Sequence, residues 1–304
     1  MSSARPLLFP HALSIAAITI TLAIPRVTPA AENLDSDRPE AWAMFYFTSV
    51  SLFSGLGTPR ARKPKEVELG LELASIPHLD SDQRRVGFEG TKVEDLNKAP
   101  LFGRGRLTVG LPWKLGLAFG YVPPIKVFGV RAHMFGLALE RPFYERGPLT
   151  LGVRAYGQIG RVVGAFTCPS DAAGFPPGSQ ENPSGCNEPS KDRTYQRHVG
   201  LELSSSYRLD ALRGLTPYVS VAGSYLNTKF RVIARTFDIP DRTRLRAETG
   251  TFTLGTGVSY PLGKSVEWSL GLAYTPLWVT RPPATSEERD SLLHARTLLS
   301  YRFR

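Results

Sequence analysis

The chain has 304 residues, and 37 lysine and arginine residues against 27 aspartate and glutamate residues give a formal net charge of +10 at pH 7. Beyond residue 30, no apolar window approaches the ~18 residues that mark a membrane-spanning helix, which excludes a helical membrane protein. A basic chain of this kind is typical of proteins that meet nucleic acid or an anionic membrane surface.

Residues 1–30 have the pattern of a secretory signal peptide. Arg5 supplies a positive start, the run from Leu13 to Ile24 is mainly apolar, and Thr28-Pro29-Ala30-Ala31 offers small residues for cleavage after Ala30. The apolar run is shorter than the ~20 residues of a spanning helix, so a retained anchor is the less favoured alternative. Because an exported chain leaves the cytoplasm, we expect no nucleic-acid partner.

Residues 31–65 are expected to form a periplasmic N-terminal segment with one short helix. Asp37 is a candidate cap, Pro39 suits a first turn, and aromatic residues follow at helical spacing, which predicts a helix within 37–57. The alternative makes 42–54 a strand, paired with another in 86–94.

From Glu66 onward, large apolar residues alternate with small or charged ones. Leu115, Leu117, Phe119 and Tyr121, for example, alternate with lysine, glycine and alanine. A period of two places the two sets on opposite faces of a strand. The pattern predicts ten strands, or twelve with the alternative above: 66–76, 103–111, 114–122, 127–141, 148–166, 196–209, 216–234, 244–260, 265–280 and 291–303.

Cys168 and Cys186 are the only cysteines. An exported protein meets an oxidising compartment, so the pair predicts one disulfide that closes a local loop. The loop between them contains no histidine, and we expect no metal site there.

The contents of the two strand faces favour a membrane barrel. A soluble barrel buries its large apolar residues, whereas a membrane barrel turns them toward lipid and encloses the polar ones. Aromatic residues at strand ends and the export signal favour the second arrangement. We therefore predict an all-β fold, a transmembrane antiparallel up-and-down β-barrel over residues 66–304, with a soluble periplasmic β-protein as the alternative.

The C-terminal sequence Leu299-Ser300-Tyr301-Arg302-Phe303 resembles the closing strand of bacterial outer-membrane β-barrels, although Arg304 follows the usual last phenylalanine. The resemblance implies a Gram-negative outer-membrane location and insertion by the barrel assembly machinery through this strand. It names no particular family. With the last strand ending in the periplasm, short turns fall on that side and long segments outside, among them 167–195.

A ten-stranded barrel is only slightly wider than one whose interior side chains fill, so no wide pore is expected. The helix in 37–57 would plug or cap the periplasmic mouth, or lie in the membrane interface. The predicted lumen collects charges of both signs, as a structural ion-pair network or, alternatively, a ligand or ion path: Glu68, Glu72, Arg106, Arg154, His198, Glu202, Glu267, His294 and Arg296.

Basic residues gather near the predicted outer strand ends. Arginine suits bidentate contact with phosphate, so we hypothesise a belt that contacts outer-membrane lipid and lipopolysaccharide, the alternative being ordinary rim charges. Its members are Arg131, Arg161, Arg231, Arg235 and Arg244.

No catalytic motif is visible. His198 and Glu202 lie on one face of a strand but about 13 Å apart, too far for a dyad. The paired acidic and Asp-x-His motifs of ten-stranded omptin-type surface proteases are not seen. We assign no catalytic residue and expect no cofactor. The favoured function is a non-enzymatic barrel, structural or binding a ligand at its surface; the alternatives are a narrow channel for small solutes and a surface hydrolase.

Overall fold

The computed structural model describes residues 31–303, so the predicted signal peptide and Arg304 lie outside the described residues. The helical elements are α1 (Pro39–Val50) and the short 3-10 helices η1 (Ala172–Gly174) and η2 (Asp210–Leu212). The barrel strands are β2 (Val67–Ser75), β5 (Leu101–Gly110), β6 (Gly116–Val122), β8 (Val130–Arg146), β9 (Leu149–Gly164), β10 (Asp192–Tyr207), β11 (Thr216–Arg231), β14 (Arg244–Pro261), β15 (Val266–Thr275) and β18 (Leu292–Phe303). The remaining short strands are β1 (Glu32–Asn33), β3 (Arg85–Gly87), β4 (Lys92–Val93), β7 (Lys126–Val127), β12 (Ala234–Thr236), β13 (Ile239–Asp241), β16 (Trp278–Val279) and β17 (Glu288–Arg289).

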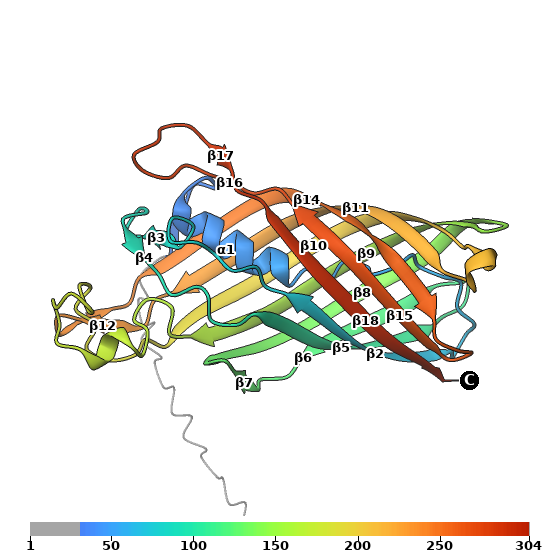
Figure 1. Cartoon of the computed structure of the whole chain (residues 1–304), viewed down its shortest axis with the longest axis horizontal. Helices are drawn as coiled ribbons and strands as arrows, with labels where there is room; N and C mark the ends of the chain where they lie inside the picture. Colours follow the sequence, from blue (N-terminus) through green and yellow to red (C-terminus); the bar gives the residue numbers. More distant parts are fainter. Residues whose placement is uncertain (1–30, 304) are drawn as a thin grey trace, which may run out of the picture. The chain divides into compact units, whose positions relative to one another are not determined.

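The ten long strands form a closed antiparallel barrel (Figure 1). Each pairs with its neighbour in the chain, and β18 closes the ring by pairing with both β15 and β2. Every predicted strand is present, so the ten-stranded prediction is confirmed. The twelve-stranded alternative is wrong, because residues 42–54 contain most of α1 and residues 86–94 contribute to the separate β3–β4 pair.

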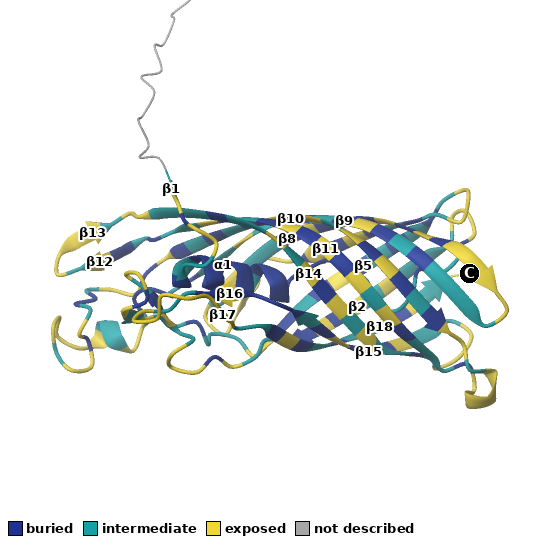
Figure 2. Cartoon of the chain, turned by 90° about the horizontal axis from the view of Figure 1, so that it is seen from above, coloured by how far each residue is buried: buried dark blue, intermediate teal, exposed yellow. Residues whose placement is uncertain are grey.

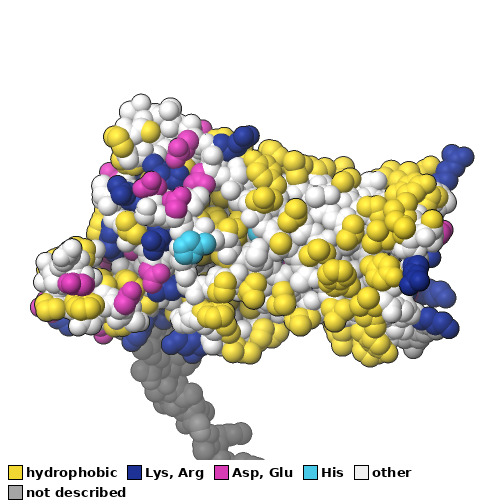
Figure 3. All heavy atoms as spheres, in the orientation of Figure 1, with side chains coloured by type: hydrophobic (Ala, Val, Ile, Leu, Met, Phe, Trp, Pro, Cys, Tyr) yellow, Lys and Arg dark blue, Asp and Glu magenta, His cyan; other side chains and the backbone are white. Residues whose placement is uncertain are grey.

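The wall of the barrel has an apolar outside and a polar inside, as the alternation predicted. Leu71 and Leu201 are 57% and 56% exposed, whereas Glu72 and Glu202, one residue further along the same strands, are 0% and 2% exposed. Figure 3 shows apolar side chains spread over the outer wall. No helix in the described part of the chain is long and apolar enough to cross a membrane.

The two ends of the barrel differ in their connections. At the short-turn end, β8–β9, β14–β15 and two further pairs are joined by two to eight residues, and the C-terminus lies here (Figure 1). At the long-loop end lie the segments 76–100, 165–191, 232–243 and 276–291. The predicted disulfide is confirmed: Cys168 and Cys186 are bonded within segment 165–191. Short periplasmic turns opposite long external loops are the asymmetry of outer-membrane barrels, which places the long-loop end outside the cell.

The predicted helix is present, but its predicted position is wrong. The sequence predicts it at the periplasmic end, as a plug or cap of the barrel mouth or in the membrane interface, whereas α1 lies within the long-loop half (Figure 2). Trp42 Nε1 donates to the Asp290 carbonyl at 2.9 Å and the Tyr46 hydroxyl donates to the Pro77 carbonyl at 2.7 Å. Both acceptors belong to long loops. The helix is buried on almost every side, which only enclosure by the barrel and its loops can provide.

The helix cap also differs from the prediction. The N-cap residue is Arg38, and no side chain caps the helix. Asp37 instead accepts hydrogen bonds from Thr280 in the β15–β18 loop, through its side chain at 2.8 Å and its backbone carbonyl at 2.6 Å. This residue therefore ties the entry of the helix to a loop.

Replacing Leu201 by arginine tests the assignment of the outer wall. The side chain points out of the middle of β10, so we expect the substitution to lower the free energy of unfolding in bilayers by about 2–4 kcal/mol. Urea titration of the protein in phospholipid vesicles measures this. The matched control is Glu188→Arg on an exposed loop residue; an equal loss in both variants would contradict a lipid-facing Leu201.

Candidate functional site

The chain that follows α1 runs through the lumen of the barrel. Residues 51–62, here called the plug, lead from the end of α1 toward the start of β2 at the short-turn end. Its backbone is hydrogen-bonded to the inner wall. Phe53 N donates to His198 Nε2 at 3.2 Å, and Gly55 N donates to the Glu202 carboxylate at 2.6 Å. His198 and Glu202 thus act on the plug rather than on each other.

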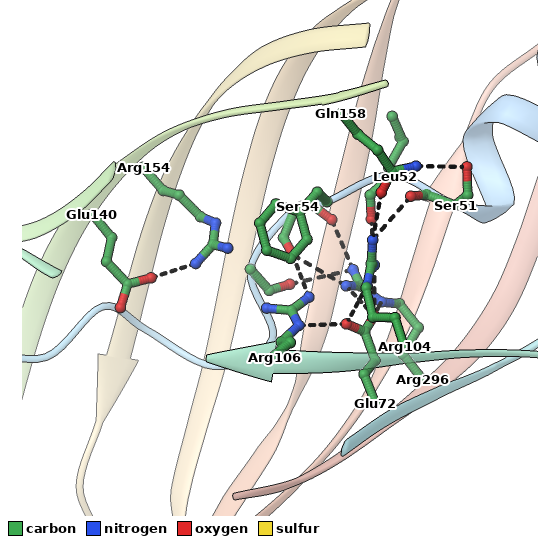
Figure 4. Close-up of polar contacts among 12 residues, drawn as sticks. Ser51, Leu52, Ser54, Glu72, Arg104, Arg106, Glu140, Arg154, Gln158 and Arg296 are labelled. Atoms are coloured by element: carbon green, nitrogen blue, oxygen red, sulfur yellow. Dashed lines mark hydrogen bonds and ion pairs between the residues drawn. The ribbon is translucent and has the colours of Figure 1, made fainter. Parts of the chain in front are cut away.

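A buried carboxylate surrounded by three arginines lies beside the plug (Figure 4). Glu72 from β2 accepts hydrogen bonds from Arg104 at 2.8 and 2.9 Å, from Arg106, and from Arg296 at 2.7 and 3.1 Å. We call these four residues the Glu72 cluster. The strand register explains why these residues meet. Glu72 lies directly opposite Arg104 on β5 and Leu298 on β18. Arg106 and Arg296 are two residues away from these positions, on the same strand faces.

The Glu72 cluster carries two more positive than negative charges, and backbone carbonyls of the plug solvate this excess. Arg104 donates to the carbonyls of Ser51 and Leu52 at 3.1 and 2.8 Å. Arg106 and Arg296 both donate to the Ser54 carbonyl, at 3.0 and 3.1 Å. Buried guanidinium groups require acceptors, and carbonyl groups supply them without a second buried charge. The cluster and the plug therefore stabilise each other.

Phe53 packs the plug against the barrel wall at β6 and β8. Its ring is fully buried and lies over the place where Gly120 and Gly136 pair between β6 and β8. A Cβ atom at either glycine would come within 2.7 Å of the ring, so only glycine leaves room there. The guanidinium groups of Arg104 and Arg106 lie 4.8 Å from the ring centroid, in cation–π contact.

A second group of charges lies in the short-turn half of the lumen. Arg62 of the plug lies 3.3 Å from both Glu68 and Glu140, and Glu140 also pairs with Arg154. Arg60 pairs with Glu68 and lies 3.5 Å from Glu267. The plug is therefore bound by ion pairs at one end and by backbone hydrogen bonds at the other.

All nine lumen residues named from the sequence lie on the inner face of the wall. Eight contact the plug or one another, and His294 is buried with its Nδ1 atom unbonded. Sequence reasoning missed Arg104, although it shares the face of Arg106 two residues further on. It also missed Arg60, Arg62 and Phe53, because no periodicity shows where a non-strand segment runs.

Neither luminal histidine has the partner that a hydrolase would need. The ring of His198 accepts a hydrogen bond from the plug, and its other nitrogen, Nδ1, has no partner. In the antiparallel register, His198 lies opposite Gln158 and Leu226, and His294 lies opposite Ala273. A carboxylate therefore does not face either ring across a strand pair.

A cavity of about 280 Å³ opens beside α1 at the long-loop end, and we call it the outer cavity. Its apolar walls come from α1, from β11 and β14, and from the loop after β9: Ala43, Met44, Phe47, Phe166, Phe230 and Leu245. Charged residues also line the cavity, and carboxylates predominate among them: Glu32, Glu40, Glu89, Glu94 and Asp241. Arg38 is the basic member and lies within ion-pair distance of Glu32, Glu40 and Glu89.

Glu94 has the most perturbed carboxyl group in the outer cavity. Burial raises its pKa to about 8, assisted by the charges of Asp192 and Asp241, although Lys92 opposes the shift from 3.1 Å away. At neutral pH this side chain is mainly protonated, and it becomes charged as the pH rises through 8.

The five basic residues named from the sequence separate into two groups. Arg131, Arg161, Arg231 and Arg244 lie on the barrel wall near the long-loop end. Arg235 belongs to the small β12–β13 hairpin instead, where its side chain is 3.5 Å from Asp238. Arg235 is therefore not part of the barrel wall on which the other four residues lie.

A closed antiparallel barrel with an apolar outer wall and a charged interior defines a transmembrane β-barrel protein of the bacterial outer membrane. No protein-family model and no curated protein matches the sequence. Several solved structures of outer-membrane proteins show a distant likeness. The outer membrane protease OmpT from Escherichia coli is 11% identical, with 79% of this chain and 98% of that chain covered and a TM-score of 0.41.

Two further structures have lower TM-scores. A major outer membrane protein from Thermus thermophilus is 14% identical over 78% of this chain and 99% of that chain, with a TM-score of 0.29. Ail, the attachment invasion locus protein of Yersinia pestis, is 10% identical over 79% of this chain and 100% of that chain, with a TM-score of 0.23. Likenesses at this level assign no activity to the chain.

Replacing Glu72 by glutamine tests the central role of this carboxylate. The substitution keeps the shape but leaves three buried guanidinium groups without a counter-charge, so we expect unfolding to become easier by about 3–5 kcal/mol. Urea titration in vesicles measures the change, and Glu188→Gln on an exposed loop is the control. A loss below about 1 kcal/mol would contradict the arrangement described.

Proposed function

We propose that this protein is a closed, non-conducting outer-membrane barrel that binds a small ligand at its external end. The observation that carries the proposal is the plug, which occupies the lumen and is hydrogen-bonded to the wall through its own backbone. A segment held in this way leaves ligand recognition to the long-loop end. The proposal includes no catalytic step.

The filled lumen supports this function over a narrow channel. Phe53 is fully buried at the level of His198, the Glu72 cluster lies beside Ser51 to Ser54, and ion pairs hold Arg62 in the half nearer the short turns. A conducting path would require the plug to leave, and that would expose the uncompensated charge of the Glu72 cluster.

The outer cavity supports the ligand-binding part of the proposal. Its apolar walls suit a hydrocarbon or aromatic body, and the excess of carboxylates suits a positive charge. We infer a ligand with an apolar body and one amine or quaternary ammonium group. The long-loop end presents this cavity to the outside of the cell.

Planar-bilayer recordings test the closed lumen. We expect the folded protein, confirmed by heat-modifiable migration on a gel, to show no stable single-channel steps at applied potentials where porins conduct. A variant that lacks residues 31–62, if it migrates as a folded barrel, is expected to conduct. Stable openings of the intact chain would overturn the non-conducting assignment.

Binding of a fluorescent alkylamine tests the outer cavity. The amine stays protonated up to pH 9, whereas Glu94 gains its charge through pH 8, so affinity should rise between pH 6 and 9. For a partly buried ion pair of ~1 kcal/mol this is about fivefold. Glu94→Gln should abolish the rise, and Met44→Trp should weaken binding at every pH by filling the cavity.

The neutral alcohol of the same size is the matched probe. It should bind more weakly than the amine and without the pH dependence. Equal binding of the two probes would contradict a cation site, and equal binding to the Met44→Trp variant would contradict the cavity as its location.

A further inference from the structure

The outer wall near the long-loop end carries basic residues in register on five neighbouring strands. One row runs across β8, β9, β10, β11 and β14 through His133, Arg161, Tyr195, Lys229 and Arg246. These positions share the strand face of the exposed residues Ile159 and Val199, so their side chains point outward.

A second basic row lies two residues closer to the loops. It contains Arg131 on β8 and then Arg193, Arg231 and Arg244, which are directly paired across β10, β11 and β14. Like charges in direct cross-strand pairs destabilise a sheet. An anion bound over the Arg193–Arg231 pair would remove that cost, so the arrangement itself favours an anionic partner.

The row closer to the membrane marks the edge of the apolar wall. It contains Phe135, Ile159, Arg197, Asn227 and Glu248. Glu248 is the acidic member of the three rows, and its carboxylate accepts hydrogen bonds from Arg246, Asn227 and Tyr225. The rows therefore keep a strong positive excess.

Two grooves meet at this edge. A groove of about 570 Å³ passes between the basic residues Arg161, Arg197 and Lys229. A second groove of about 1070 Å³ continues along the apolar wall past Phe119, Leu137 and Val199, and both share Phe135 and Ile159 in their lining. Gly157, between Leu137 and Val199, has no side chain to fill the second groove.

We propose that these grooves bind one phosphorylated glycolipid of the outer leaflet, the lipid A part of lipopolysaccharide. Arginine and lysine of the first groove bind its phosphate groups, because guanidinium groups make bidentate, charge-assisted hydrogen bonds to phosphate. The second groove takes acyl chains against the apolar wall. The position near the long-loop end matches the leaflet where this lipid is found, and the site lies outside the barrel, independent of the outer cavity.

The test compares two triple variants that remove the same charge. Arg161→Gln, Arg197→Gln and Lys229→Gln together alter the basic groove; Lys114→Gln, Arg208→Gln and Lys264→Gln alter exposed residues at the short-turn end. Each protein, in phosphatidylcholine nanodiscs, is titrated with bis-phosphorylated lipid A. We expect about tenfold or greater weakening in the first variant and less than about twofold in the second.

Two further probes identify the recognised chemistry. Dephosphorylated lipid A should bind the wild-type protein about as weakly as lipid A binds the first variant. Phosphatidylglycerol, with one phosphate and two chains, should bind weakly to every protein. Equal loss in both triple variants, or equal affinity of wild type for phosphatidylglycerol and lipid A, would overturn the proposal. Should the first triple variant fail to show heat-modifiable migration, Arg197→Gln alone decides on the same criteria.

Discussion

The structure depends on how a buried excess of positive charge is solvated inside the barrel. Glu72 neutralises one of three guanidinium groups. The two positive charges that remain are buried among side chains that exclude water. A low-dielectric interior makes unpaired charge very costly, so acceptors have to be supplied by the protein. The carbonyl groups of Ser51, Leu52 and Ser54 are these acceptors, which is why the segment after α1 runs through the lumen.

This solution separates the barrel into regions with different tasks. The outer wall meets lipid, the lumen is occupied by the chain itself, and the long-loop end holds α1, the disulfide loop and the outer cavity. Trp42 and Tyr46 connect the helix to two different long loops. The helix thus links the plug below it to the surface that faces the outside, and a ligand in the outer cavity would contact the same helix.

The ten-stranded size makes such an arrangement possible. A ten-stranded barrel is slightly wider than an eight-stranded one and leaves room along its axis for one extended segment. Where that segment carries a bulky side chain, the facing wall residues have to be small. Gly120 and Gly136 provide that space for Phe53. The glycines that alternate with large residues along these strands therefore serve the plug as well as the strand pattern.

The sequence by itself determined the strands, their faces and the disulfide. Side-chain direction in a strand follows a period of two, which is local, so the alternation of Leu117 and Phe119 with small residues was enough to separate the two faces of the wall. The aromatic residues at strand ends and the export signal then favoured lipid outside the barrel. The same parity placed Glu72, His198 and Arg296 in the lumen. It predicted ten strands and left twelve as the alternative, because the sequence alone did not decide whether residues 42–54 form a helix or a strand.

Only the tertiary structure decided the path of residues 31–65 and the meeting of residues from different strands. The plug has no repeating pattern, since its hydrogen bonds go to Arg104, His198 and Glu202 rather than to a neighbouring strand. Cross-strand register, which aligns Arg193 with Arg231 and Arg244, depends on pairing between segments far apart in the chain. Such pairings follow from the closure of the whole barrel, and no single segment carries that information.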